Sequence, residues 1–405
     1  MQALVGALRI RHSIIMEHVD IAIIGGGVVG SATAYYLKKH GFSGSIAIVE
    51  KDTSYQFGCT GRSLGGLRQQ FSTPENIELS KFGLRLIRNL KQEFGPEADV
   101  SFHENGYLIM ASEDGLPILQ ENHRIQLSHG ADNVILKGND LTARFSWLMG
   151  EGVAGGCFGL SGEGWLDPYS LMTLLRKAAV SMGVKIIPQA LTAVSCTGDK
   201  VSSITLSNGE TLPCSYFVNA AGTAAGHVAT LANITLPVGP RKRYVYLLDC
   251  PSASEALHAA PLTVEPTGIY FRPEGRNFLC GLSPEEHEEP TEMNWDVDYS
   301  WFEERIWPLL AERVPQFETI KVINSWVGQY DYNALDQNAI IGAHPQVNNF
   351  YFANGFSGHG LQQGPAAGNA IAELIVHGTY RTIDLARFSY DRVAHNEPLF
   401  EKNVI

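Results

Sequence analysis

Apolar residues near the amino terminus follow one pattern for six positions and another for the next sixteen. Residues 19–24 are almost continuously apolar and β-branched, which predicts a buried strand. Four glycines within residues 25–30 interrupt this run, and residues 31–40 then have the spacing of an amphipathic helix. A second apolar run, residues 45–49, ends at Glu50. The pattern predicts a strand–helix–strand unit.

The glycines of this unit fit a phosphate-binding turn. Gly25 permits the tight turn out of the strand, Gly27 lets a pyrophosphate approach the backbone, and Gly30 lets the helix pack against the strand. The free N–H groups of the helix then point at the phosphates. Glu50 lies where an acid accepts hydrogen bonds from a ribose diol. A glycine-rich turn that binds nothing is the alternative. The interpretation is a dinucleotide site; the acid disfavours NADP and leaves NAD and FAD open.

A second part of the nucleotide domain is predicted further along. Asp167 and Pro168 are typical of a helix start, so a helix is expected over residues 169–182. A buried strand over residues 216–222 ends in small residues that let a cofactor approach the backbone. Shorter strands are expected at residues 185–187, 189–194 and 201–206, the last with a turn at Asn208 and Gly209.

Two regions differ from this α/β texture. Residues 100–150 combine short β-like runs, such as 106–110, with charged helices, and residues 240–325 are aromatic and alternate as strands. We interpret both as one mixed-sheet substrate domain, an α+β second part inserted twice into an α/β fold of the Rossmann type. The expected parts are 16–98, 156–238 and 326–385 for the nucleotide-binding domain, 99–155 and 239–325 for the substrate domain, and a tail at 386–405.

The carboxyl end repeats the strand, turn and helix pattern. Residues 350–354 predict a strand, residues 355–364 are glycine-rich, and residues 365–377 predict a helix. A helix amino terminus near Gly360 would favour negative charge by about 0.3–2 kcal/mol. His359 in this turn is expected either as a histidine held by backbone hydrogen bonds or as a catalytic base.

Composition excludes some classes of function. The chain has 405 residues, of which 44% are hydrophobic and 18% charged, as in a globular protein with a sizeable core. Its net charge of −12 argues against nucleic acid as a partner. The six cysteines form no CxxC pair and no zinc-ligand spacing, and the acidic run at residues 284–290 is interpreted as a solvated loop, so no metal is expected.

No uninterrupted apolar stretch is long enough to predict a transmembrane segment. Residues 1–15 contain Arg9, Arg11 and His12 but no acid. They fit a short organellar presequence or an extended start with Met16 as the initiator.

Together these motifs resemble the D-amino acid oxidase/sarcosine oxidase (DAO) family of flavoproteins. The resemblance covers about residues 19–385 and rests on the glycine turn with Glu50 and on the runs at residues 59–63, 219–222 and 356–360. The last run is rarer than the glycine turn, and it makes FAD the expected cofactor. Within the family, runs at residues 69–77, 241–246, 330–338 and 358–363 are similar to the group called FAD-dependent oxidoreductase domain-containing protein 1.

The resemblance implies a set of cofactor contacts. We expect the ADP half near Glu50, the pyrophosphate and flavin edge near residues 60–68, adenine near Leu191, and the flavin pyrimidine ring near residues 358–362. The full expected set is Gly25, Gly27, Val28, Val29, Gly30, Glu50, Lys51, Thr60, Gly61, Arg62, Ser63, Arg68, Leu191, Ala221, Gly222, Gly358, His359, Gly360, Leu361 and Gln362.

Three departures from the family pattern shape the expected activity. Gln329 stands where sarcosine oxidases bind FAD through cysteine, so the FAD is expected to be non-covalent. Gln362 stands where those oxidases place a lysine that assists reaction with oxygen. A dehydrogenase that passes electrons to a quinone or another carrier is therefore expected. Gly66 replaces a histidine of dehydrogenases for basic D-amino acids, which puts that substrate class in doubt.

The resemblance implies oxidation of the C–N bond of an amino acid or secondary amine, with hydride transfer to flavin N5. An arginine fork suits the substrate carboxylate, and the expected catalytic and substrate-binding residues are His359, Tyr270, Arg272, Arg243, Tyr246 and Tyr330. Alternatively, a solvated edge-strand patch is formed by Arg241, Lys242 and Arg243, and the tyrosines are core.

Two other functions stay open. The animal members of the similar group are mitochondrial and linked to assembly of respiratory complex I, so a flavin-containing assembly factor is one alternative. Oxidation of a 2-hydroxy acid or glycerol phosphate is the other, because one fold serves many reactions. The resemblance implies the mitochondrial matrix for a eukaryotic chain and the cytoplasm for a bacterial one.

Overall fold

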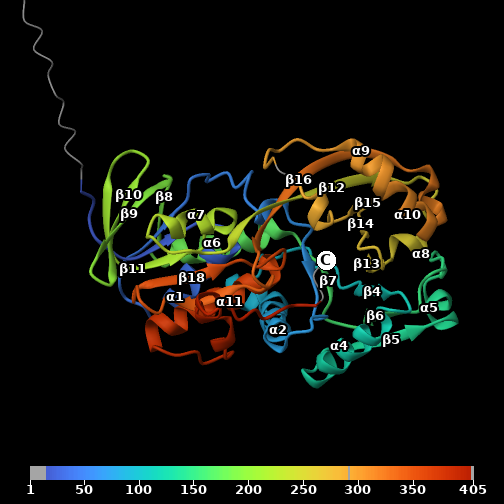
Figure 1. The fold of residues 1–405 in the computed structure, drawn as a ribbon, viewed down its shortest axis with the longest axis horizontal. Coiled ribbons are helices and arrows are strands. Elements are labelled where there is room, and N and C mark those ends of the chain that lie inside the picture. The colour runs from blue at the N-terminus through green and yellow to red at the C-terminus, as the bar shows by residue number, and fades with distance from the viewer. Residues whose placement is uncertain (1–14, 291, 403–405) are drawn as a thin grey trace, which may run out of the picture.

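The computed structural model describes residues 15–290 and 292–402. It contains two large sheets that lie side by side, each with its own helices (Figure 1). A third, two-stranded sheet consists of β3 (Gly66–Leu67) and β7 (Gly164–Trp165). The expectations that fall on residues 1–14 lie outside the described residues.

The first sheet has the order β17-β18-β11-β1-β2-β8. Strand β1 pairs in parallel with β11 and β2, β2 pairs in parallel with β8, and β11 in parallel with β18. An antiparallel hairpin, β9 and β10, extends β11. The strands are β1 (Val19–Ile24), β2 (Ile46–Val49), β8 (Lys185–Ile187), β9 (Leu191–Thr197), β10 (Lys200–Leu206), β11 (Thr211–Asn219), β17 (Ile340–Ala343) and β18 (Phe350–Asn354).

Both faces of β1 are buried, as its unbroken apolar run predicts for a parallel strand. Ile21 and Ile23 pack into one core with helices on one face, whereas Ala22 and Ile24 pack into another on the opposite face. The helices of this half are α1 (Val28–Lys39), α2 (Pro74–Arg88), α3 (Leu90–Phe94), α6 (Pro168–Ser181), α7 (Ala225–Thr230), α11 (Gly360–His377) and α12 (Asp391–Ala394).

Helices α1 and α11 pack closely against each other. A side chain at Gly368 of α11 would come within 2.5 Å of the backbone nitrogen of Thr33 in α1. This contact fixes the two helices whose amino termini face the same cavity.

The second sheet has the order β16-β12-β15-β14-β13-β4-β6-β5 and is antiparallel except between β13 and β4. An aromatic core that includes Tyr246, Phe271 and Phe317 fills its covered face. The strands are β4 (Tyr107–Ala111), β5 (Asn133–Lys137), β6 (Gly155–Gly159), β12 (Val238–Asp249), β13 (Leu262–Val264), β14 (Tyr270–Glu274), β15 (Asn277–Gly281) and β16 (Lys321–Asn333). The helices beside it are α4 (Leu116–Ser128), α5 (Asn139–Arg144), α8 (Glu255–His258), α9 (Tyr299–Trp301) and α10 (Trp307–Arg313).

The expected fold class, an α/β nucleotide domain interleaved with a mixed-sheet second part, is confirmed. The domain boundaries stay a prediction, although one of them, at residue 326, falls inside β16, which pairs with β12 along its length.

Two helices begin earlier than the sequence pattern predicted. Helix α1 begins at Val28 because the glycine turn is already complete at Gly27. Helix α11 begins at Gly360, so Pro365 lies inside it rather than at its first turn. A proline there removes one backbone hydrogen bond of the helix. None of the helices in the described ranges is long and apolar enough to cross a membrane.

Candidate functional site

A cavity of about 670 Å3 opens between the two sheets. Its floor is formed by the carboxyl ends of β1, β2 and β11, where ligands bind in open α/β sheets, and its far wall by β12, β14 and β16. Most of the cofactor residues expected from the sequence line it: Gly25, Gly27, Val28, Val29, Glu50, Lys51, Thr60, Arg62, Ser63, Arg68, Ala221, Gly222, Gly358, His359, Gly360, Leu361 and Gln362.

The nucleotide end of the cavity has the backbone geometry expected of a phosphate turn. Gly25 has φ of +99°, and a side chain there would collide with the carbonyl of Ala220. Glu50 at the end of β2 accepts hydrogen bonds from the backbone nitrogens of Gly26 (2.8 Å) and Asp52 (2.8 Å). These bonds hold the carboxylate in place at the cavity edge, where its remaining lone pairs can accept ribose hydroxyls.

Three expected residues do not line the cavity. Gly30 lies behind the turn, where a side chain would come within 1.9 Å of the carbonyl of Gly25, so its place fits close helix–strand packing. Gly61 abuts the carbonyl of Tyr55. Leu191 begins β9, and the structure does not bring it to the cavity.

The cavity end where the flavin is expected, called the flavin end, is formed by the turn that precedes α11. Ser357 (φ +52°) and Gly358 (φ +102°) both have left-handed backbone conformations. Asp331 Oδ2 accepts from the nitrogens of Gly355 (2.8 Å) and Phe356 (3.2 Å) and so fixes the turn. Burial raises the pKa of Asp331 to about 6.

Arg68 and His359 meet at the centre of the cavity wall. Arg68 is fully buried, and its Nη2 lies 3.0 Å from His359 Nε2. Because a guanidinium only donates, Nε2 is the acceptor and the neutral imidazole carries its proton on Nδ1. Burial and the positive charge of Arg68 hold the pKa of His359 well below its ordinary value.

Glu163 supports this pair, and sequence reasoning missed it. Its carboxylate accepts from the nitrogen of Gln69 (2.6 Å) and from Nε2 of Gln70 (2.7 Å), and the carbonyl of Gln70 accepts from Arg68. Burial raises the pKa of Glu163 to about 7. The residue lies in a loop far from Arg68 in sequence and belongs to no motif.

The expected substrate residues divide into two groups. Arg243, Tyr270 and Tyr330 line the cavity. Arg272 does not, because its guanidinium donates to the carbonyl of Leu64 (3.1 and 2.9 Å). Tyr246 is fully buried, and its hydroxyl donates to the carbonyl of Asp298. Arg272 and Tyr246 therefore link strands of the second sheet to adjacent segments of the chain.

Arg243 has a carboxylate partner within the protein. The carboxylate of Glu289 accepts hydrogen bonds from Nη1 and Nη2 of Arg243, at 3.0 and 2.9 Å. Its Oε1 also lies 3.4 Å from Nη1 of Arg241. The Nε of Arg243 is buried with no hydrogen-bond partner among the described residues. Glu289 belongs to the acidic run at residues 284–290, so this run is not only a solvated loop.

The two glutamines that depart from the family pattern both line the cavity. Gln362 Oε1 accepts from the backbone nitrogen of Arg68 at 2.7 Å, which leaves its amide nitrogen as the donor toward the cavity. Gln329 Nε2 lies 3.3 Å from the carbonyl of Met293. In the described ranges, no group of three or more His, Cys, Asp or Glu side chains could hold a metal ion.

The residues present fit FAD. A side chain at Gly25 or Gly358 would collide with protein atoms, so the backbone itself forms both ends of the cavity, as close approach to a pyrophosphate and a ring requires. The amino termini of α1 and α11 both lie at the cavity, where their first-turn amides favour an anionic ligand.

Comparison with known proteins agrees with this geometry. The profile of the DAO family, described as FAD dependent oxidoreductase, matches residues 20–374. FAD-dependent oxidoreductase domain-containing protein 1 of Xenopus laevis is 42% identical over 96% of this chain and 85% of its own length.

Solved structures with the same fold include L-proline dehydrogenase from P. horikoshii, with a TM-score of 0.84, 22% identity and coverage of 95% of this chain and all of that one. Glycine oxidase from Geobacillus kaustophilus follows with a TM-score of 0.78, 22% identity and coverage of 92% and 98%. The expected cofactor, FAD, is confirmed by this membership. The chain belongs to the DAO family of FAD-dependent oxidoreductases.

Proposed function

We propose that this chain oxidises the C–N bond of an amino acid or secondary amine and passes the electrons to a carrier other than oxygen. One observation carries the proposal: Arg243 and Tyr330 line the same cavity as His359 and Gln362 at the flavin end. A substrate held by its carboxylate on the first pair would present its α-carbon to a ring beside the second. The names of the two structural neighbours, L-proline dehydrogenase and glycine oxidase, support the substrate class.

The carboxylate end of the substrate is assigned to Arg243, Tyr270 and Tyr330. The guanidinium of Arg243 lies 5.2 Å from the centre of the Tyr330 ring, so the two groups form one wall. Burial raises the pKa of both tyrosine hydroxyls, so they stay protonated and can donate hydrogen bonds to a carboxylate. Arg272 and Tyr246 are left out of this assignment because they do not reach the cavity.

The amine end requires a neutral nitrogen lone pair. His359 is neutral, because Arg68 occupies its Nε2 and lowers its pKa, and it presents only an N–H donor. Its place beside the flavin end suits hydrogen bonding to a ligand rather than removal of a proton. Bound FAD supplies the acceptor for the two electrons of the C–H bond, and the imine that results hydrolyses in water.

The electron acceptor follows from the glutamines. The resemblance puts Gln362 where sarcosine oxidases have a lysine, and Gln362 lines the cavity with an uncharged amide instead of an ammonium group. Gln329 cannot form the thioether that a cysteine forms, so we propose that FAD is held without a covalent bond. Acid precipitation tests this: non-covalent FAD appears in the supernatant, and yellow precipitate would contradict it.

An anaerobic bleaching screen tests the proposed activity. The FAD-loaded protein is mixed without oxygen with amino acids, N-methylated amino acids and 2-hydroxy acids, and flavin absorbance is followed. The expected result is bleaching by an amine that carries a carboxylate, with Arg243→Ala requiring about tenfold or more of the same compound. Bleaching only by 2-hydroxy acids would replace the substrate class, and bleaching by no compound in the panel would overturn the proposal.

A further inference from the structure

The carboxyl-terminal segment, residues 386–402, is partly buried. It carries two buried charged residues, Arg392 and Glu401, which are 5% and 4% exposed. Buried charges are strongly unfavourable unless they are paired and hydrogen-bonded, so the partners of these two residues show what the segment holds.

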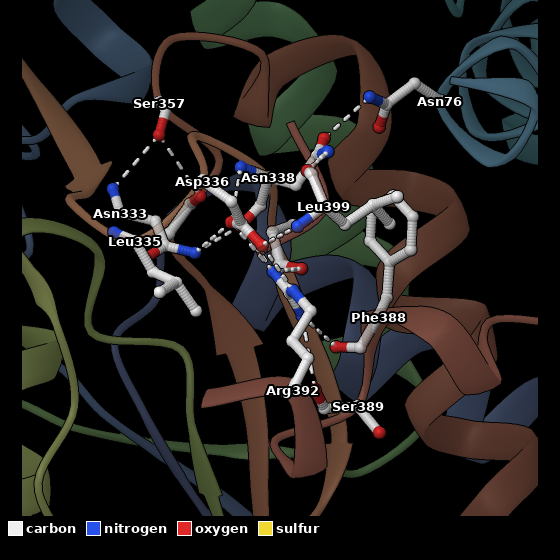
Figure 2. Close-up of polar contacts among 12 residues, drawn as sticks. Asn76, Asn333, Leu335, Asp336, Asn338, Ser357, Phe388, Ser389, Arg392 and Leu399 are labelled. Carbon is white, nitrogen blue, oxygen red and sulfur yellow. Dashed lines mark hydrogen bonds and ion pairs between the residues drawn. The ribbon is translucent and has the colours of Figure 1, made fainter. Parts of the chain in front are cut away.

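Arg392 binds the turn between β16 and β17. Its Nε lies 2.6 Å from Asp336 Oδ2, and its Nη2 donates to the carbonyls of Asn338 and Ala339, both at 2.9 Å (Figure 2). Asp336 also accepts from the backbone nitrogen of Leu399 at 3.0 Å. The segment therefore contacts this turn twice, through a side chain and through its own backbone.

A chain of hydrogen bonds through Asn333 connects Asp336 to the turn at the flavin end. Its Oδ1 accepts from Asn333 Nδ2 at 2.8 Å, and the backbone nitrogen of Asn333 donates to Ser357 Oγ at 3.0 Å (Figure 2). Ser357 has φ of +52°, a conformation that is unfavourable for residues with a side chain and persists only where the surroundings impose it. Gly358 and His359, which line the cavity, follow directly.

Glu401 binds the residues at the start of α2. Its carboxylate accepts from the nitrogen and hydroxyl of Ser72 (2.7 and 2.6 Å), the nitrogen of Thr73 (3.1 Å) and Nδ2 of Asn76 (2.8 Å). These residues form the entry to α2 and follow the segment that carries Arg68. Asn76 in turn accepts from Gln363 of α11 at 3.1 Å.

We propose that residues 386–402 are a positioning element of the flavin site, in which Arg392 sets the turn before α11 and Glu401 sets the segment that presents Arg68 to His359. The two arms meet, because Asn76 Nδ2 also donates to Asn338 Oδ1 at 2.7 Å. Loss of either charge leaves buried hydrogen-bonding groups without a partner. The proposal concerns how the protein holds FAD, so it does not depend on which substrate is oxidised.

The test compares Glu401→Ala and Arg392→Lys with Arg387→Ala. Arg387 lies on the same segment, is mostly exposed and pairs with Glu75 of α2, so it controls for changes to the segment itself. The FAD dissociation constant of the full-length apoprotein is measured by titration. Amide hydrogen exchange of the apoprotein is then compared between residues 68–76 and 355–360 and strands β14 and β15.

We expect FAD binding to weaken by about tenfold or more in both variants. Glu401→Ala removes the charge and its hydrogen bonds, whereas Arg392→Lys keeps the charge but cannot donate to Asp336, Asn338 and Ala339 at once. Exchange should rise first in residues 68–76 for the former and residues 355–360 for the latter, with β14 and β15 unchanged and Arg387→Ala like the wild type. FAD binding within about twofold of the wild type, or exchange that rises equally everywhere, would overturn the proposal.

Glu401→Gln replaces Glu401→Ala if the alanine variant does not fold. It keeps the size of the side chain and one acceptor oxygen, so an intermediate loss of FAD affinity is expected. Wild-type affinity in Glu401→Gln would contradict the role of the charge.

Discussion

Arg68 donates a hydrogen bond from Nη2 to Nε2 of His359 over 3.0 Å, and this contact fixes the state of the imidazole. Arg68 also donates to the carbonyl of Gln70, and its guanidinium lies 4.1 Å from the centre of the Phe71 ring. Burial lowers the pKa of Arg68, and four nearby ionisable groups act in the opposite direction: Tyr107, Glu401, Glu163 and Tyr330. The histidine therefore faces the cavity as a neutral donor, and its Nε2 is unavailable as a base.

We predict that His359 stays neutral, with its proton on Nδ1, from pH 5 to pH 8. Nitrogen-15 spectra of histidine-labelled protein report the tautomer directly, and the signal is assigned by its absence in His359→Gln. In Arg68→Met the positive charge and the donor are both lost, so the pKa of His359 should rise toward its ordinary value. In Arg68→Lys, which keeps the charge, the pKa of His359 should rise less. An imidazole that titrates near pH 6.5 in the wild type would contradict the assignment.

A second prediction concerns Glu163 and pH. Burial raises the folded-state pKa of this acid to about 7, so its contribution to stability is fully present below its unfolded pKa and is lost as pH rises through 7. Glu163→Gln removes this dependence. Relative to the wild type, the variant should gain on the order of 1–3 kcal/mol of unfolding free energy between pH 5 and pH 8.

Urea unfolding of the apoprotein at each pH measures this difference. Asp331, whose pKa is raised to about 6, contributes a slope of the same sign in both proteins and cancels in the comparison. The constant effect of the changed hydrogen bonds does not alter the slope. Parallel stability curves for the two proteins would refute the role of Glu163.

The third prediction separates two arginines that looked equivalent in the sequence. Arg272→Ala breaks buried hydrogen bonds to Leu64, so it should lower stability by about 3 kcal/mol rather than act on substrate alone. Arg243→Ala should instead raise KM about tenfold or more while FAD stays bound. Thermal unfolding with and without FAD, together with steady-state kinetics, distinguishes them. A rise in KM without loss of stability in Arg272→Ala would restore its expected substrate role.

The difference between these arginines shows where sequence reasoning reached its limit. Runs such as residues 19–24 and 350–354 predicted β1 and β18 to the residue, because local apolar patterns determine local structure. The sequence also predicted the glycine turn and Glu50 as parts of the cofactor site, because this motif is local too. Arg243 and Arg272 lie on β12 and β14, two strands of one sheet that β15 separates, and both have tyrosines nearby in the sequence, so only the three-dimensional pairing decides which one faces the cavity.

Residues that act over long sequence separations were not predictable at all. Glu163 reaches Gln69 and Gln70 across more than ninety residues, and Glu401 reaches Ser72 across 329. A single acid in a loop has no periodicity or spacing that points to a partner. Its role becomes visible only when burial shows that its charge must be satisfied.

A fourth prediction concerns Glu289, whose carboxylate binds Arg243 as a substrate carboxylate would. Such a substrate must share the guanidinium with Glu289 or displace it. Glu289→Gln weakens the internal pair, so benzoate, a simple carboxylate probe, should bind about fivefold or more tightly, as measured by perturbation of the flavin spectrum. Glu286→Gln is the matched control, because Glu286 is exposed and 3.8 Å from Arg241. Weaker binding of benzoate to Glu289→Gln would show that Glu289 orients the arginine for the ligand.

The last prediction concerns the electron acceptor. Gln362 lies in the first turn of α11, with Oε1 held by the backbone nitrogen of Arg68 and a weaker contact of 3.3 Å from Ser80 Oγ. Reaction with dioxygen develops negative charge on oxygen, and an uncharged amide stabilises that charge less than an ammonium group does. The wild-type protein, reduced anaerobically and mixed with air, should therefore reoxidise slowly but react readily with a soluble quinone.

Gln362→Lys places a cation at this position and should raise the rate of reoxidation by air about tenfold or more, equivalent to about 1.4 kcal/mol of barrier. Gln362→Met has similar length and no charge, so it should not accelerate the reaction, and it controls for the lost contact to Arg68. Substrate bleaching should survive in both variants, because neither change touches Arg243. Rapid turnover of the wild type in air, with one peroxide formed per substrate, would show that the amide does not limit the reaction with oxygen.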